Sequence, residues 1–373
     1  MELKVETRSI VSELNHAVSI VETKGTIPIL AHLLMKAQDG YLEIDATDLE
    51  VTFRSRVPAV VSEPGGITVD AKSFAQLVRG FSGAKELLLK TTDDRKLFVQ
   101  PVGEKPEYFF STLPEEDYPR LLEASGEGSF TLPVSSFRKI LSEVLTSAGS
   151  DESRFSIRGA LMIIDQKSLA MVSTDAHRLT FTKRNMEIGV ENPLRVLVPK
   201  KTLQEAQKID GSEDIRILIK DNHIFFESGN RVLYSRLMDA NFPAYEKVIP
   251  KDSNKVVTIK RTDLMEKLRR ILFFSDIKTR AVNFEFRKDG TIQMDTRNDK
   301  GDTGIEKFNS EAYEGDDVKI AFNGQYLIDF LNAVEDDKVL LKLKDFDCQC
   351  LIEPVRDKAE GECMNVLMPL RVD

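Results

Sequence analysis

Apolar residues recur with a helical period in three separate stretches of this chain. Each stretch follows a short extended run and a polar residue suited to capping a helix, at residues 5–10, 132–137 and 259–264. The three runs start 127 residues apart, and the chain is therefore predicted to be a threefold repeat. Within each stretch the apolar positions form one face of a helix. They are Ile10, Leu14, Ala17 and Val18, then Phe137, Leu141, Val144 and Leu145, then Leu264, Leu268, Ile271 and Leu272.

A second helix and several strands are predicted in each repeat. Helical patterns follow residues 69–74, 198–203 and 320–325, and strand-like runs follow at 86–90, 215–220 and 339–344. The alternation of apolar and polar residues at 41–45 and 340–343 is typical of half-buried antiparallel strands. We therefore predict an α+β fold of three repeated domains with sheets outside two helices each. Turn formers near 126–128 and 251–254 place the domains at 1–125, 126–252 and 253–373.

Composition limits where the protein works. The 373 residues contain no apolar run near the roughly 18 that span a bilayer. The first residues do not resemble a signal peptide, and we expect a cytoplasmic protein. Cys348, Cys350 and Cys363 form no C-x-x-C pair, which favours reduced thiols over a zinc site or disulfides.

Charge is distributed unevenly along the chain. The net charge is -9, yet the six predicted helices carry eleven basic and six acidic residues. Some segregation is expected in any protein, because Lys and Arg favour helices and Asp favours turns. If the helices share one face, however, their cations would suit a phosphate backbone and would bind it without reading sequence.

The motifs of common enzymes are missing. The sequence has no Walker, dinucleotide-binding, zinc-protease or nucleophile-elbow motif. Asp175 and His177 leave general acid-base catalysis open as an alternative, although no nucleophile is nearby. Thr47 and Asp48 lie 127 residues before Thr174 and Asp175, which favours a shared Thr-Asp turn. A repeat adaptor that binds only proteins is a further alternative.

Six short motifs, in this order and on a threefold repeat, resemble the bacterial sliding clamp family, the β subunits of DNA polymerase III. They are TIPIL at 26–30, ATDLE at 46–50, STLP at 111–114, TDAHRL at 174–179, DANFPAY at 239–245 and MPLRV at 368–372.

The resemblance implies a ring around DNA. Two chains would close head to tail, with helices lining the hole and sheets outside, and the ring would encircle double-stranded DNA without sequence specificity. It would confer processivity by tethering partners through short linear peptides, without catalytic residues or a cofactor of its own. The implied partners are the polymerase III α subunit, the clamp loader δ subunit, translesion polymerases, mismatch repair proteins and ligase.

The resemblance also implies site residues. A peptide pocket between the second and third domains would contain Ile157, Thr174, Ala176, His177, Arg178, Leu179, Pro243, Lys247, Val248, Val366, Met368, Pro369, Leu370 and Arg371. Ala176 stands where the family often has Gly and Lys247 where it often has Arg, and Asp373 is an additional last residue. The implied DNA contacts are Lys24, Lys72, Lys200, Lys201 and Arg154. Tyr108 would lie at the subunit boundary with Phe273 and Phe274, and at least one of these two rings should point outward.

Overall fold

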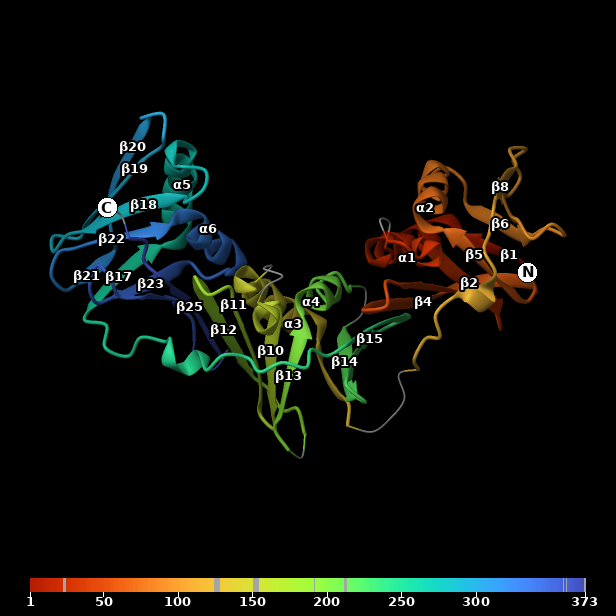
Figure 1. Cartoon of the computed structure of the whole chain (residues 1–373), viewed down its shortest axis with the longest axis horizontal. Coiled ribbons are helices and arrows are strands. Elements are labelled where there is room, and N and C mark those ends of the chain that lie inside the picture. The colour runs from red at the N-terminus through yellow and green to blue at the C-terminus, as the bar shows by residue number, and fades with distance from the viewer. Residues whose placement is uncertain are drawn as a thin grey trace. The chain divides into compact units, whose positions relative to one another are not determined.

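The chain folds into two compact units (Figure 1). The computed structural model describes residues 1–22, 25–123, 128–149, 154–190, 192–210, 213–357, 359 and 361–371. The first unit comprises residues 1–135 and 204–237. The second comprises residues 136–203 and 238–373.

Six α-helices occur in the described residues, and all six lie where the apolar periods predict them. They are α1 (Thr7–Ile20), α2 (Ala71–Gly80), α3 (Val134–Val144), α4 (Lys200–Ala206), α5 (Arg261–Ile271) and α6 (Gly324–Ala333). Side chains cap two of the second helices, because Asp70 accepts a hydrogen bond from the Ser73 amide and Asn323 from those of Gln325 and Tyr326. The predicted helix faces are buried, except that Val18 and Leu145 are half-buried.

The first unit is built on one antiparallel sheet. Its strands are β1 (Glu2–Glu6), β2 (His32–Gln38), β3 (Tyr41–Thr47), β4 (Val51–Glu63), β5 (Gly65–Asp70), β6 (Glu86–Thr91), β7 (Leu97–Pro101), β8 (Tyr108–Phe110), β9 (Phe130–Pro133), β14 (Asp214–Lys220), β15 (His223–Ser228) and β16 (Arg231–Arg236). The order is β8-β7-β6-β1-β4-β16-β15-β14-β9, with β2, β3 and β5 branching from β4. The long β4 pairs with β3 and β16 through its first half and with β1 through its second.

The second unit contains two antiparallel sheets. The larger has the order β13-β10-β11-β12-β25-β24-β23-β17-β21 and the smaller β20-β19-β18-β22. Their strands are β10 (Gly159–Asp165), β11 (Ser168–Thr174), β12 (Arg178–Asn185), β13 (Leu194–Pro199), β17 (Lys255–Lys260), β18 (Ala281–Phe286), β19 (Thr291–Arg297), β20 (Thr303–Asn309), β21 (Ala312–Glu314), β22 (Val318–Asn323), β23 (Lys338–Leu343), β24 (Cys350–Pro354) and β25 (Glu362–Leu367).

Continuous sheets explain why the middle repeat contributes to both units. In the first unit β16 of the middle repeat hydrogen-bonds to β4 of the first repeat. In the second unit β12 of the middle repeat hydrogen-bonds to β25 of the last. Each repeat has eight strand positions, since β20 and β21 together correspond to the long β4. Both junctions therefore join the fourth strand of one repeat to the eighth strand of the next.

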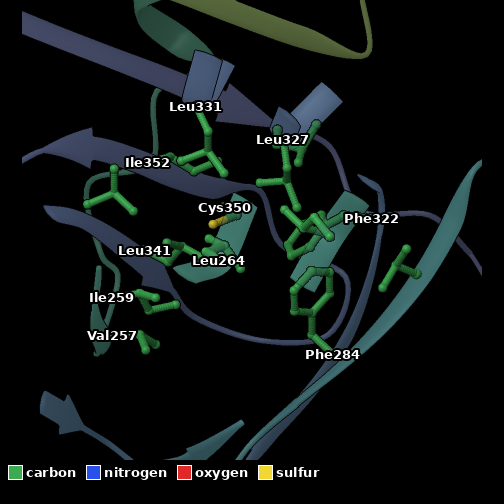
Figure 2. Close-up of a cluster of buried hydrophobic side chains, with 14 of the residues drawn as sticks. Val257, Ile259, Leu264, Phe284, Phe322, Leu327, Leu331, Leu341, Cys350 and Ile352 are labelled. Atoms are coloured by element: carbon green, nitrogen blue, oxygen red, sulfur yellow. The ribbon is translucent and has the colours of Figure 1, made fainter. Parts of the chain in front are cut away.

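The core of the last repeat shows how the predicted helices are held. Leu264 of α5 and Leu327 and Leu331 of α6 pack over strand residues such as Leu341 and Phe322 (Figure 2). All five side chains are fully or almost fully buried. Burying a large apolar side chain contributes about 1.5–3 kcal/mol, so this face holds both helices against the sheets.

One strand differs from its prediction. The alternating residues 41–45 predict a half-buried strand, but Glu43 and Asp45 are buried in β3. The reason is on β4, where Arg54 lies 2.7 Å from Asp45 and Arg56 lies 2.9 Å from Glu43. Cross-strand ion pairs therefore allow the polar residues of this strand to leave solvent.

Candidate functional site

A cavity of about 510 Å³ opens in the second unit beside the start of β12. Four segments far apart in sequence form its walls: the 154–157 turn, residues 174–179, residues 243–248, and the end of β25 with its extension. Its lining residues are Arg154, Phe155, Ser156, Ile157, Thr174, Ala176, Arg178, Leu179, Pro243, Tyr245, Val248, Val366 and Met368. A mostly apolar cavity with a few polar groups at its edge is typical of a ligand site.

The rim of the cavity is shaped by the predicted Thr-Asp turn. The Asp175 carboxylate accepts hydrogen bonds from the backbone amides of His177 and Arg178, at 3.0 and 2.9 Å. The Thr174 hydroxyl donates to the Arg178 carbonyl at 2.7 Å. Between them Ala176 has a φ of 74°, the left-handed region that favours Gly. Gly would adopt this backbone conformation without the steric cost that Ala176 bears.

Arg178 is the most constrained cation at the rim. Its guanidinium lies 3.0 Å from Asp175 and 2.7 Å from Asp329 of α6, and it stacks 4.1 Å from the centre of the Tyr326 ring. Two carboxylates and an aromatic face therefore fix its position. Burial raises the pKa of the Tyr326 phenol, which stays neutral beneath the guanidinium.

The floor of the cavity is apolar and well packed. Leu179 and Val366 are buried in one hydrophobic cluster with Tyr245, and Val248 packs against it. The Tyr245 and Phe181 rings stack with centroids 6.1 Å apart. Burial raises the pKa of the Tyr245 phenol. The cavity can therefore accept aliphatic or aromatic groups of a ligand.

The structure brings nine of the fourteen residues predicted for the peptide pocket into this lining. They are Ile157, Thr174, Ala176, Arg178, Leu179, Pro243, Val248, Val366 and Met368. His177 and Lys247 are exposed and lie outside the lining. Pro369, Leu370 and Arg371 line a neighbouring groove, which Met368 shares with the cavity.

Sequence reasoning missed three lining residues and placed a fourth elsewhere. Phe155, Ser156 and Tyr245 belong to the wall, and Arg154, predicted as a DNA contact, lines the cavity as well. Phe155 is 51% exposed. Tyr245 lies within the DANFPAY motif, which could have suggested it.

The geometry around His177 does not form a catalytic dyad. The Asp175 carboxylate bonds the two turn amides and Arg178, and the His177 carbonyl accepts a hydrogen bond from the Met368 amide at 2.9 Å. The side chain of His177 is exposed. Asp175 is thus engaged as a turn residue, as the repeat predicts.

The predicted DNA contacts occupy different environments. Lys72 is exposed on α2, whereas Lys200 and Lys201 are half-buried on α4. The Lys200 ammonium donates to the Ala148 carbonyl at 2.7 Å, and burial, aided by nearby Arg178, lowers its pKa. Lys24 lies outside the described residues.

The residues predicted for the subunit boundary are exposed apolar groups. Phe273 is 85% exposed and Phe274 39%, both in the short 3-10 turn Leu272–Phe274 after α5. The outward orientation predicted for at least one ring is therefore present. Tyr108, 37% exposed, belongs to β8 at the end of its sheet.

Other sites are few in the described part of the chain. No cluster of three or more His, Cys, Asp or Glu side chains suited to a metal occurs among the described residues. Cys348, Cys350 and Cys363 are free thiols, and burial raises the pKa of Cys350 and Cys363. No described helix is long and apolar enough to cross a membrane.

Comparison with known proteins covers the whole chain. Models of the N-terminal, central and C-terminal domains of the DNA polymerase III beta subunit match residues 1–122, 131–244 and 246–371. The beta sliding clamp of Escherichia coli K12 is 30% identical over 376 residues and is covered fully, as is this chain.

Solved structures also match the chain over its full length. The DNA polymerase III subunit beta of Pseudomonas aeruginosa superposes with a TM-score of 0.91 at 25% identity, and a sliding clamp of that organism bound to griselimycin with 0.89 at 26%, each over the full length of both chains. The three repeats, their antiparallel sheets and the domain matches together show that this chain belongs to the family of DNA polymerase III β subunits, the bacterial sliding clamps.

Proposed function

We propose that this sliding clamp closes head to tail with a second copy into a ring around duplex DNA. The ring tethers the polymerase α subunit, the clamp loader δ subunit, translesion polymerases, mismatch repair proteins and ligase through short peptides, and performs no catalysis itself. Its domain limits are 1–125, 126–252 and 253–373, and it works in the cytoplasm on the nucleoid.

The arrangement of strands carries this proposal. Two junctions within the chain join a fourth strand to an eighth strand, β4 to β16 and β12 to β25. The remaining fourth strand, β20, ends its sheet, and so does the remaining eighth strand, β8. Joining β20 of one copy to β8 of another repeats the same junction, and two copies complete six repeats.

Exposed apolar groups lie at both of these edges. Phe109 on β8 is 55% exposed and Ile305 on β20 is 65% exposed. Phe273 and Phe274 lie near β20, since Gly304 approaches the Phe274 ring. An exposed edge strand with apolar side chains invites pairing, and a subunit boundary protects it.

The 510 Å³ cavity supports the tethering part of the proposal. Its apolar floor and polar rim suit a short extended peptide in which Gln is followed by Leu and an aromatic residue. Such a peptide pays ordering entropy, so we expect single-site affinity around micromolar. Tethering then acts by raising the effective concentration of the partner at the DNA.

Retention on closed and open DNA tests the ring. Once loaded, the protein should stay on closed circular DNA through high salt and leave when the circle is cut, because topological linkage does not depend on counterion release. Phe273→Ala with Phe274→Ala should give monomers in analytical ultracentrifugation and lose this retention. Equal salt-dependent loss from circles and linear DNA would instead indicate ordinary electrostatic binding.

Calorimetry with the peptide tests the cavity. Deleting residues 368–373 should abolish binding of the Gln-Leu-aromatic peptide while dimer mass is retained, because the truncation removes Met368 from the wall. The Phe273→Ala, Phe274→Ala protein is the matched control and should bind the peptide normally. Unchanged binding to the truncated chain would refute the assignment of the cavity.

A further inference from the structure

A second hollow, of about 920 Å³, lies in the second unit on the face of the small sheet formed by β18, β19 and β22. Strand side chains such as Asn283, Asp295 and Lys319 form one side. Phe346, Asp347 and the chain segment 368–371 also line it. We name this hollow the tail groove.

The tail groove continues the cavity proposed to hold the peptide. Met368 lines both hollows. The chain beyond Met368 is held against the edge of the small sheet, because the Leu370 amide donates to the Ala321 carbonyl of β22 at 2.8 Å. A peptide anchored in the cavity therefore needs only a short extension past Met368 to enter the tail groove.

The charges of the tail groove favour a cation. The lining contains three carboxylates, Glu285, Asp295 and Asp347, and two cations, Lys319 and Arg371. Glu285 is shared between Lys319, 3.8 Å away, and Arg287 outside the lining, 3.2 Å away. Asp295 is hydrogen-bonded to a neutral group, the Asn283 amide, at 2.8 Å.

An exposed aromatic ring strengthens this preference. Phe346 is 66% exposed, next in sequence to Asp347. An aromatic face beside a carboxylate suits an arginine or lysine side chain, which gains both a cation–π contact and a charge-assisted hydrogen bond.

We propose that the tail groove binds a basic flank of the same peptide whose apolar anchor occupies the cavity, so that this clamp selects partners with Arg or Lys beside the anchor. This inference rests on the proposed tethering function. It assigns to Asp295 and Asp347 a specificity role that the anchor cavity does not supply.

Fluorescence anisotropy with the full-length protein tests the tail groove. The probes are peptides with a Gln-Leu-Ser-Leu-Phe anchor and either two Arg or two Gln residues on its amino or its carboxyl side. One Arg-flanked peptide should bind about fivefold tighter than its Gln twin at low salt, and the gain should disappear at high salt.

Three variants that each remove one charge localise the effect. Asp295→Asn and Asp347→Asn should each reduce the gain to about twofold or less. Asp316→Asn, an exposed carboxylate outside the tail groove, should leave it unchanged. Each variant should bind the Gln-flanked peptides as the parent protein does.

The outcomes separate the tail groove from the cavity. Equal affinity of the parent protein for Arg- and Gln-flanked peptides would overturn the role of the tail groove but not that of the cavity. A gain that survives in both groove variants would also overturn it, because the gain would then come from attraction to the acidic chain as a whole. Failure of every peptide to bind the parent protein would overturn the tethering function and with it this inference.

Discussion

The two junctions between repeats have the same turn but different neighbours. In the first unit Asp48 accepts hydrogen bonds from the amides of Glu50 and Val51, as Asp175 does from those two and three residues ahead of it in the second unit. Leu49 has a φ of 75° and Ala176 one of 74°. The backbone of this turn is therefore common to both junctions, and the differences between them lie in the side chains around it.

One difference lies in a pair of facing strand positions. Asp45 of β3 faces Arg54 of β4, and the equivalent Val172 of β11 faces Phe181 of β12. Arg54 forms an ion pair with Asp45 and a second one, at 2.9 Å, with Glu123 in the segment after β8. In the second unit Phe181 instead stacks on Tyr245 and extends the apolar floor. This pair of positions is therefore polar at the first junction and apolar at the second.

The segments that contain Tyr118 and Tyr245 lie beside the two junctions and differ in the same way. Tyr118, equivalent to Tyr245, is buried with Ile29, Leu30 and Leu34, and its hydroxyl donates to the Asp45 carbonyl at 3.2 Å. Its segment is tied to the polar strand pair. The polar strand pair therefore holds its neighbouring segment by a hydrogen bond, whereas the apolar pair packs against Tyr245.

A buried ion cluster is common to both junctions. Arg231 lies 2.8 Å from Glu13 of α1 and 2.6 Å from Asp210. Arg356 lies 3.0 Å from Glu143 of α3 and 2.5 Å from Asp336. In each case the following repeat supplies the arginine and the aspartate. These clusters therefore fix consecutive repeats to each other at both junctions.

The largest expected effect tests the ion cluster that both junctions share. Glu143→Ala should lower the free energy of unfolding by about 5 kcal/mol, because it leaves the buried guanidiniums of Arg184 and Arg356 without their common partner. Urea unfolding measures the change, and loss of the folded far-UV signal would agree with it. Glu335→Ala, an exposed partner of Lys139, is the control and should cost under about 0.5 kcal/mol. Equal costs for the two variants would contradict a structural role for the cluster.

The next effect tests the polar strand pair. Arg54→Ala should cost about 3 kcal/mol, since Asp45 stays buried without its partner. Asp45→Val with Arg54→Phe, which copies the second junction, should come within about 1 kcal/mol of the parent protein. Arg56→Ala, at a half-exposed arginine, is the control for loss of charge. A double variant as unstable as Arg54→Ala would show that the two strand pairs are not interchangeable.

A smaller effect is the pH dependence of stability that Asp45 should give the first junction but not the second. Burial raises the pKa of Asp45 to about 6, against an ordinary value of 3.8. Between these values the folded chain keeps a proton that the unfolded chain releases, so stability falls as pH rises from 4 to 6, by about 2–3 kcal/mol. Asp45→Asn should remove this contribution, whereas Val172→Ala at the equivalent position should keep it. If the free energies of unfolding of the parent protein and Asp45→Asn changed with pH in parallel, Asp45 would not be the source of the pH dependence.

Much of the fold could be predicted because the repeat and the helical period are local signals. The apolar faces of α1, α3 and α5 follow from spacing alone. Burial of Glu43 and Asp45 could not, because it depends on arginines that only strand pairing brings opposite them. The sharing of the middle repeat between two units also depends on strand pairing across repeats, which leaves no local signal.

The site was predicted less completely. Thr174 and Asp175 are readable as a turn because the first repeat contains the same residues. The remaining lining came from family resemblance, which supplied Val366 and Met368 but omitted Phe155 and Tyr245. A cavity wall is assembled from segments distant in sequence, so neighbours such as Phe181 are visible only in three dimensions.

The smallest expected effect concerns the turn that both junctions share. Ala176 and Leu49 hold left-handed φ angles that cost an L-residue roughly 1–2 kcal/mol, whereas Gly adopts them without this cost but adds unfolded-state entropy of about 0.5–1 kcal/mol. Ala176→Gly and Leu49→Gly should therefore each raise the free energy of unfolding by about 0.5–1 kcal/mol, seen as a higher urea midpoint at unchanged m-value. Ala333→Gly in α6 is the control and should lower it by a similar amount, because helical backbone gives Gly no such advantage. If either turn variant lost stability as Ala333→Gly does, the turns would be held by something other than the conformation they share, and the backbone equivalence of the two junctions would fail at that position.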